Sequence, residues 1–128
     1  MSAHWPPLVQ ALQDPARYDH PVQAVSVVET HISYVLLTGP YAYKIKKAVD
    51  LGFADFSTLA KRHHACTEEV RINVRTAPEL YLGVLAVTGT ESEPVLAAPE
   101  AEGAFEYVVK MRQFPAEARL DRVLRAGG

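Results

Sequence analysis

The sequence has little of what marks secreted, membrane-spanning or nucleic-acid-binding proteins. Its one cysteine, Cys66, is typical of a reduced cytoplasmic protein. Thirteen basic and fifteen acidic residues nearly balance, which does not favour binding to nucleic acid. No apolar run approaches the roughly 18 residues that a membrane span requires, and the N-terminus lacks the basic start and apolar stretch of an export signal. We therefore expect a cytoplasmic protein with no membrane or nucleic-acid partner.

The chain does have enough apolar residues to form one hydrophobic core. They make up 48% of its 128 residues, and a chain of this length forms one domain or one lobe of a larger unit. A short helix is expected over Trp5–Leu12, where two prolines are compatible with the first turn. Residues 24–47 are dense in valine, threonine and tyrosine around a turn signal at Gly39-Pro40, so two or three strands are expected there.

The second half of the sequence predicts one long helix between strands. Ser57 is a suitable N-cap for a helix that continues to about Thr76, after a loop over residues 50–56. Its expected buried face repeats at steps of three and four residues: Leu59, His63, Cys66, Val70, Asn73, Val74 and Ala77. Strand-like runs follow at residues 80–89, 95–99 and 105–114, and a last helix is expected over 116–126. This order predicts an α+β fold with an antiparallel sheet of about five strands, the long helix packed on it and a short N-terminal helix.

The strand expected over residues 41–47 separates two kinds of side chain. Alternate residues of a strand share a face, which gives an apolar face of Tyr41, Tyr43 and Ile45 with Lys47, and a second face of Ala42, Lys44 and Lys46. One interpretation is a half-buried strand with solvated lysines. The other is a ligand site, in which a small residue leaves room for a flat molecule and a lysine on the same face meets its phosphates.

Two adjacent glutamates of the long helix are expected to point in different directions. At roughly 100° per residue, Glu68 points away from the buried face, whereas Glu69 lies at the edge of that face. Glu69 can therefore reach the sheet and hold a lysine of the neighbouring strand. The alternative is a local pair with Arg62 or Asn73 on the same helix.

A lysine on the third strand held by a glutamate of the next helix positions the nucleotide in the protein-kinase fold. The stretches Glu29–Val84 and Glu106–Leu124 resemble the N-terminal part of a bacterial family of aminoglycoside-phosphotransferase-like proteins. In many members the rest of the kinase-like domain and a P-loop ATP-binding domain follow. The resemblance spans essentially the whole chain, and it implies that residues 1–128 form one N-lobe, the nucleotide-binding half of a small-molecule kinase.

The resemblance also implies roles for single residues. Lys44 would meet the α- and β-phosphates of ATP, with Glu69 as its partner on the helix and Ala42 under the adenine. Lys46 is the alternative phosphate lysine, because it shares the face of Lys44.

The same resemblance implies a hinge at the end of the last strand. Backbone groups of the segment that ends at Phe114 would meet the adenine edge, namely those of Met111, Arg112 and Gln113.

Two departures from the kinase pattern limit what this chain can do. The turn over residues 29–33 has no glycine, so any phosphate cover must come from side chains and amides of Thr30, His31 or Ser33. The chain also has no His-Gly-Asp or Asp-x-Asp stretch, and the catalytic base and the magnesium ligands of the fold belong to the C-terminal lobe. We therefore expect ATP binding without phosphoryl transfer, and Mg²⁺ would be bound through the missing lobe.

Other classes of function are less well supported. An isolated lobe exposes the surface that its C-lobe would cover, so a non-catalytic module that binds a separate C-lobe, another protein or a second copy of itself is the alternative. His63, His64 and Cys66 are close in sequence, but no second pair completes the four ligands of structural zinc, and no metal site is expected. No nucleophile and base with a recognisable spacing indicate a complete small enzyme.

Overall fold

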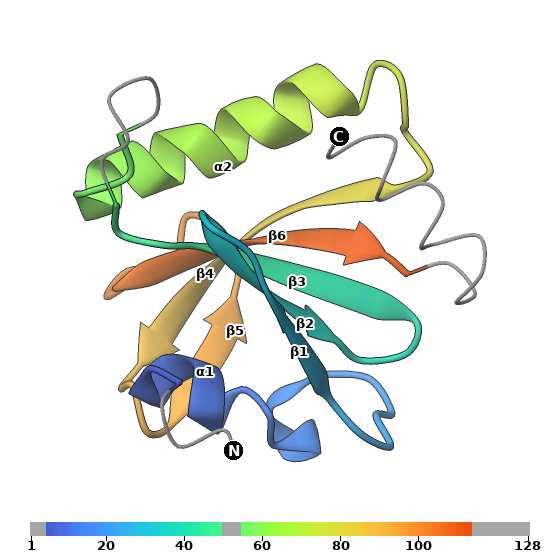
Figure 1. Ribbon diagram of the computed structural model, residues 1–128, viewed down its shortest axis with the longest axis vertical. Coiled ribbons are helices and arrows are strands. Elements are labelled where there is room, and N and C mark those ends of the chain that lie inside the picture. The colour runs from blue at the N-terminus through green and yellow to red at the C-terminus, as the bar shows by residue number, and fades with distance from the viewer. Residues whose placement is uncertain (1–4, 50–54, 114–128) are drawn as a thin grey trace.

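The computed structural model describes residues 5–49 and 55–113 and has the expected α+β architecture (Figure 1). Its elements in chain order are α1 (Pro7–Ala11), the 3₁₀ turn η1 (Pro15–Arg17), β1 (Ser26–Glu29), β2 (Ser33–Leu37), β3 (Tyr41–Lys46), α2 (Leu59–Asn73), β4 (Tyr81–Gly89), β5 (Pro94–Ala97) and β6 (Glu106–Arg112). The predicted short N-terminal helix and long central helix are both present. Residues 50–54 of the predicted loop, Phe114 and the last predicted helix lie outside the described residues.

The strands form one antiparallel sheet in the order β1-β2-β3-β6-β4-β5. It has six strands where about five were expected, because residues 24–47 form three strands, the larger of the two numbers predicted there, and each of the three later runs forms one. β1, β2 and β3 follow one another as the predicted meander, and Gly39 turns the chain between β2 and β3 with a φ of +109°. A positive φ of this kind is accessible to glycine at little cost.

The last strand, β6, lies between β3 and β4 and joins the two halves of the chain. In its register with β3, Met111 pairs with Ala42 and Val109 pairs with Lys44. Residues directly opposite one another on paired strands share a face of the sheet. The predicted hinge segment is therefore next to the predicted lysine strand.

One face of the sheet is an apolar core covered by the N-terminal segment, which lies below the sheet in Figure 1. Its buried members are Leu8, Val9, Leu12, Tyr18, Leu36, Tyr43, Ile45, Val87 and Val108. The aliphatic side chains of α1 and the alternate residues of β2, β3, β4 and β6 meet there. Burial of this set removes apolar surface from water and so stabilises the described fold.

Helix α2 covers the opposite face, above β6 and β4 (Figure 1). The Cys66 side chain is fully buried, and the His63 ring stacks on the Tyr107 ring with 3.8 Å between centroids. The predicted apolar stripe is only partly correct, because Val74 follows the last helical residue and is 38% exposed. The packed stripe is therefore short and centred on Cys66.

The predicted N-cap of this helix was wrong by one residue, and its predicted C-terminal end was wrong by three. Thr58, not Ser57, is the N-cap, and its Oγ1 accepts a hydrogen bond from the Lys61 amide. The Ser57 amide instead donates to Asp55 Oδ1 at 3.0 Å, in a turn that precedes the helix. The helix ends at Asn73 rather than Thr76, because the chain turns where the Asn73 carbonyl accepts the amides of Thr76 and Ala77.

In the part of the chain that the structure describes, neither helix has the length and apolar composition that crossing a bilayer requires.

Candidate functional site

The strand β3 presents its two faces as predicted. Tyr43 and Ile45 join the apolar core, and Lys44 and Lys46 point to the side covered by α2. Ala42 is buried on that same side, two residues before Lys44. The interpretation of both lysines as freely solvated side chains is wrong, since each makes an ion pair.

Both lysines meet one carboxylate, that of Glu69 on α2. Lys44 Nζ donates to Glu69 Oε2 at 2.8 Å, and Lys46 Nζ donates to Glu69 Oε1 at 2.6 Å. The Glu69 side chain is 14% exposed, that of Lys44 25% and that of Lys46 7%. The predicted contact between the helix glutamate and the strand lysine is thus present, and Lys46 is a second partner that the sequence interpretation did not assign to Glu69.

Burial and the neighbouring lysines have opposite effects on the pKa of the Glu69 carboxyl. Burial acts to raise the pKa of this carboxyl, but the charges and hydrogen bonds of Lys44 and Lys46 outweigh it and lower the pKa below its ordinary value. The pKa of Tyr81, a neighbour of Glu69, is raised to about 12 by burial, by the charge of Glu69 and by a hydrogen bond with Glu69. Glu69 is therefore ionised and Tyr81 neutral at physiological pH.

The local pairs proposed for Glu69 from the sequence are absent among the described contacts of its carboxylate. Arg62 pairs with Glu106 of β6, with Nε 3.0 Å from Oε1, and its Nη1 donates to the Phe56 carbonyl. Asn73 donates to the backbone carbonyl of Glu69, not to its carboxylate. Arg62 lies partly buried in this pair, so its guanidinium is held by Glu106 and not by Glu69.

Glu68 lies on the solvent side, as predicted. Its carboxylate accepts from Arg71, one turn along the helix, at 2.6 Å. The two adjacent glutamates thus differ as helical geometry requires, one pairing along the surface and the other with the sheet.

The charges around Glu69 do not balance. Two ammonium groups share one carboxylate, and the neighbouring Arg62–Glu106 pair is neutral as a unit. Among the described residues, this cluster carries one surplus positive charge at a partly buried position. A site of this kind favours an anion, because a partly desolvated cation interacts more strongly with an opposite charge than a solvated one does.

Exposure distinguishes the two candidate phosphate lysines. Lys46 is almost fully buried, and its ammonium also lies over the Phe56 ring, 5.2 Å from the centroid. Lys44 is the more accessible of the two. Lys44 can therefore reach a ligand with less rearrangement than Lys46.

The predicted hinge residues lie beside this site, with most of their described amide groups already bonded. The Arg112 amide donates to the Leu80 carbonyl at 2.8 Å, and the Gln113 amide donates to the Pro40 carbonyl at 2.9 Å. The Gln113 side chain accepts from the Gly39 amide at 3.1 Å. Met111 is half-buried beside Ala42. The side chain of Met111 is thus better placed to meet a flat ligand than the amides of Arg112 and Gln113.

The turn between β1 and β2 satisfies most of its own polar groups. The Thr30 hydroxyl accepts from the amides of Ile32 and Ser33 and lies 2.9 Å from the Ser33 hydroxyl. Ser33 is buried, whereas His31 is exposed. Thr30, His31 and Ser33 were considered for phosphate cover. The hydroxyls of Thr30 and Ser33 take part in the described hydrogen bonds of this turn, whereas the His31 side chain does not.

The structure adds residues that local sequence patterns did not indicate. Tyr81 of β4 reaches Glu69, and Phe56 lies against the Lys46 ammonium. The register of β4 with β6 places Tyr81 opposite Met111. Tyr81 and Met111 are neighbours because β4 pairs with β6. The sequence pattern of one strand does not show which strand lies beside it, so this contact could not be predicted from either strand alone.

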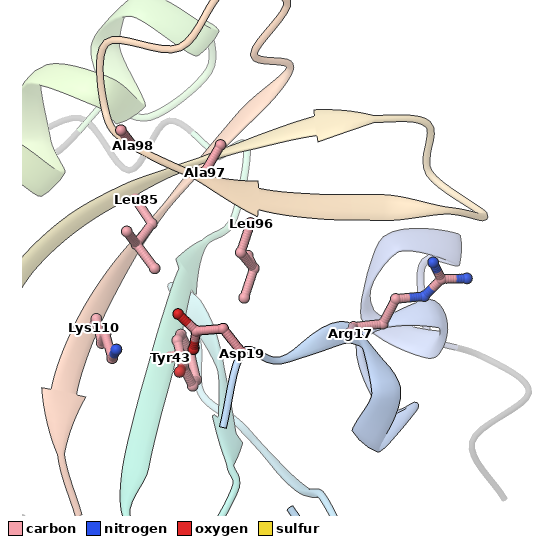
Figure 2. A pocket seen from close by; sticks show the side chains of 8 residues that line it. All are labelled: Arg17, Asp19, Tyr43, Leu85, Leu96, Ala97, Ala98 and Lys110. Atoms are coloured by element: carbon pink, nitrogen blue, oxygen red, sulfur yellow. The ribbon is translucent and has the colours of Figure 1, made fainter. Parts of the chain in front are cut away.

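A separate cavity of about 210 Å³ lies on the opposite, α1-facing side of the sheet (Figure 2). Asp19, Tyr43, Leu96 and Lys110 are among the residues that line it. Because Tyr43 and Lys44 point to opposite faces of β3, this cavity is distinct from the Lys44–Glu69–Lys46 cluster. No group of three or more histidine, cysteine or acidic side chains suited to a metal occurs within the described ranges.

Comparisons with known proteins place the chain among larger relatives of unknown role. No family model and no solved structure matches it. It is 37% identical over 111 residues, or 84% of its length, to uncharacterized proteins of Mycobacterium bovis and of two strains of Mycobacterium tuberculosis. The chain spans about a fifth of the length of these relatives, since the match covers 20% of each.

Proposed function

We propose that the chain is the ATP-binding N-lobe of a kinase-like small-molecule phosphotransferase of the aminoglycoside-phosphotransferase-like group. The observation that carries this proposal is the 2.8 Å ion pair between Lys44 on the third strand and Glu69 on the helix that follows. In protein kinases the corresponding lysine binds the α- and β-phosphates and pairs with a helix glutamate.

The charge of the cluster supports an anionic ligand. Glu69 neutralises one of the two lysines, so a phosphate group that meets Lys44 would balance the surplus positive charge. Lys44 would act as a compact, movable point charge, which suits contact with phosphate oxygens.

The face around Lys44 supports a flat, apolar group next to the phosphates. Ala42 contributes only a methyl group, and the register places Met111 beside it. Val35, directly opposite Lys44 on β2, is half-buried on the same face. An adenine ring would cover Ala42 and Met111 while its phosphates extend toward Lys44.

The proposal assigns binding, not transfer, to these residues. A kinase-like reaction also needs an aspartate base and metal-binding side chains, and the chain lacks the corresponding motifs. We expect the isolated chain to bind ATP and to leave it unhydrolysed. Transfer to an acceptor would require a C-terminal catalytic lobe.

Titration of ATP into the purified chain by calorimetry tests this proposal. We expect binding to weaken at least about tenfold in Lys44→Met, because the substitution removes the accessible ammonium and keeps an unbranched side chain. Lys47→Met is the matched control, since Lys47 pairs with Glu29 near the end of the same strand. It should leave ATP affinity within about twofold of the original.

Two results would contradict the proposal. One is no binding at about 10 mM ATP, which corresponds to a dissociation constant far weaker than a nucleotide site needs. The other is equal weakening in the Lys44 and Lys47 variants, which would indicate general charge attraction. Absence of binding together with concentration-dependent dimerisation in analytical ultracentrifugation would support the self-associating module instead.

A further inference from the structure

We propose that the cavity on the α1-facing side of the sheet binds a free α-amino acid with an aliphatic side chain. Asp19 would meet the ammonium group of this ligand and Lys110 its carboxylate, while Leu85 and Leu96 would cover its side chain. All four residues line the cavity. The site lies on the opposite face of the sheet from the proposed ATP site, and its occupation does not depend on a nucleotide.

The cavity has the size and the apolar wall that a small aliphatic molecule needs. Its volume of about 210 Å³ is below the range of about 300–1,000 Å³ that is typical of sites for drug-sized ligands. Leu85 of β4 and Leu96 of β5 extend toward it in Figure 2. Both leucines are half-buried, so an aliphatic ligand would cover apolar surface that the core leaves accessible. The residue paired with Lys110 on β4 is Gly83, which has no side chain to fill the space beside it.

Two opposite charges line this cavity without an ion-pair partner. Within the described ranges, neither Asp19, from the segment after η1, nor Lys110, from β6, takes part in a salt bridge. Lys110 Nζ lies over the Tyr41 ring, 4.3 Å from its centroid. This contact occupies one side of an ammonium group that has three hydrogens to donate. A ligand that carries both an ammonium and a carboxylate group would pair with both side chains.

The Tyr43 hydroxyl adds a second acceptor for the ligand's ammonium group. His20 Nδ1 lies 3.3 Å from the Pro21 carbonyl, which can only accept, so in the neutral ring Nδ1 carries the hydrogen. His20 Nε2 therefore accepts from the Tyr43 hydroxyl, at 2.9 Å, and the Tyr43 oxygen keeps its lone pairs for another donor. Burial and the charge of Asp19 raise the pKa of Tyr43, so the phenol stays neutral.

Arg17 also lines the cavity, but its guanidinium is directed elsewhere. Its Nη2 donates to the Ser92 carbonyl at 3.3 Å, and Figure 2 shows the guanidinium pointing away from Asp19 and Lys110. The described lining therefore offers one cation and one carboxylate to a ligand. Such a pair matches a zwitterion, whereas a phosphate would meet the Asp19 carboxylate as a like charge.

Methyl NMR with three small molecules of similar shape tests this site. Free L-leucine carries both charges, isocaproate lacks the ammonium group, and isoamylamine lacks the carboxylate. We expect free L-leucine to shift the methyl signals of Leu85 and Leu96 in a saturable way and to leave those of Ala42 and Met111, on the other face, unchanged. Either analogue should bind at least about tenfold more weakly, because it loses one of the two charge pairs.

Substitutions assign each charge to its partner. Lys110→Met and Asp19→Asn should each weaken binding of free L-leucine at least about tenfold. Lys110→Met should not weaken isoamylamine, which has no carboxylate to lose, and Asp19→Asn should not weaken isocaproate. Lys47→Met and Glu68→Gln are the matched controls, because both side chains pair elsewhere, and they should keep the affinity within about twofold. An unchanged Leu36 methyl signal confirms that each variant is folded.

Three results would overturn this assignment. The first is no saturable shift of Leu85 and Leu96 at about 50 mM free L-leucine or L-valine. The second is binding of isocaproate or isoamylamine as tight as that of free L-leucine, which would indicate apolar contact alone. The third is full affinity for free L-leucine in Lys110→Met or Asp19→Asn. None of these measurements uses a nucleotide, so they leave the proposed ATP site untouched, and failure of ATP binding leaves this cavity site untouched.

Discussion

The two faces of the sheet use the same strands for different purposes. On the α1-facing side, the alternate residues of β2, β3 and β6 are apolar, and Leu36, Tyr43 and Val108 are almost completely buried. On the α2-facing side, β3 contributes Ala42, and it adds two lysines that share one carboxylate. One face therefore contributes mainly hydrophobic stabilisation, and the other holds unbalanced charge in a partly buried place.

This difference separates the face that stabilises the fold from the face that carries the proposed binding site. A partly buried ion cluster contributes little net stability, because desolvation offsets most of the attraction between its charges. The apolar face must therefore stabilise the fold against that cost. The comparison predicts large stability effects for substitutions on the α1-facing side, and smaller stability effects with large binding effects on the other side.

The largest loss of stability is expected from Leu36→Ala on the apolar face. Truncation of a fully buried leucine removes apolar contacts and leaves a cavity, which costs about 2–5 kcal/mol of unfolding free energy. Val28→Ala is the matched control, because Val28 is 47% exposed on the edge strand β1, and it should cost less than about 1 kcal/mol. Urea unfolding measures both, and equal losses would refute the assignment of the core to this face.

A smaller loss is expected from Glu69→Gln on the charged face. The substitution leaves Lys46 buried without its carboxylate, and we expect about 1–3 kcal/mol of destabilisation at neutral pH. Glu68→Gln is the matched control, since Glu68 pairs with Arg71 along the exposed side of the helix. A loss in Glu68→Gln as large as in Glu69→Gln would contradict the difference between the two positions.

The pH dependence of the same variant gives a second measurement. Because the folded-state pKa of Glu69 lies below its ordinary value of 4.5, its ionised form stabilises the fold above about pH 4.5, and this contribution is lost as the pH falls through the folded-state pKa. Glu69→Gln should therefore flatten the acid side of the stability curve. Unchanged acid sensitivity would show that Glu69 is not held by the two lysines.

The smallest effect is expected at the start of α2. Thr58→Ala removes the hydroxyl that accepts from the Lys61 amide, and loss of an N-cap costs about 1 kcal/mol. Ser57→Ala should cost less than about 0.5 kcal/mol, because the Ser57 side chain does not cap the helix. The reverse order of the two losses in urea unfolding would restore Ser57 as the N-cap.

Local periodicity explains which features could be predicted from the sequence. The two-residue repeat of a strand separates Tyr43 from Lys44, and the helical repeat separates Glu68 from Glu69, so both assignments hold in the structure. To predict the contact of Lys44 with Glu69, one further inference was required, that the helix packs on the sheet. The order of helices and strands in the sequence already indicated this packing.

Long-range packing explains the features that could not be predicted. Burial of Lys46 depends on Phe56 and on the position of α2 over the sheet, and neither follows from a local pattern. The choice between Ser57 and Thr58 as N-cap depends on Asp55, which binds the Ser57 amide. The contact of Tyr81 with Glu69 depends on β6 lying between β3 and β4.

Methyl NMR with ATP tests most directly the central claim, that the lysine-bearing face binds a nucleotide. Side-chain methyl groups report the two faces of the sheet separately, whereas backbone amides of a strand report both. We predict that ATP shifts the methyl signals of Ala42 and Met111 and leaves those of Leu36 and Ile45 unchanged, and that Lys44→Met abolishes the shifts. Shifts confined to Leu36 and Ile45, or none on either face at saturating ATP, would contradict the account.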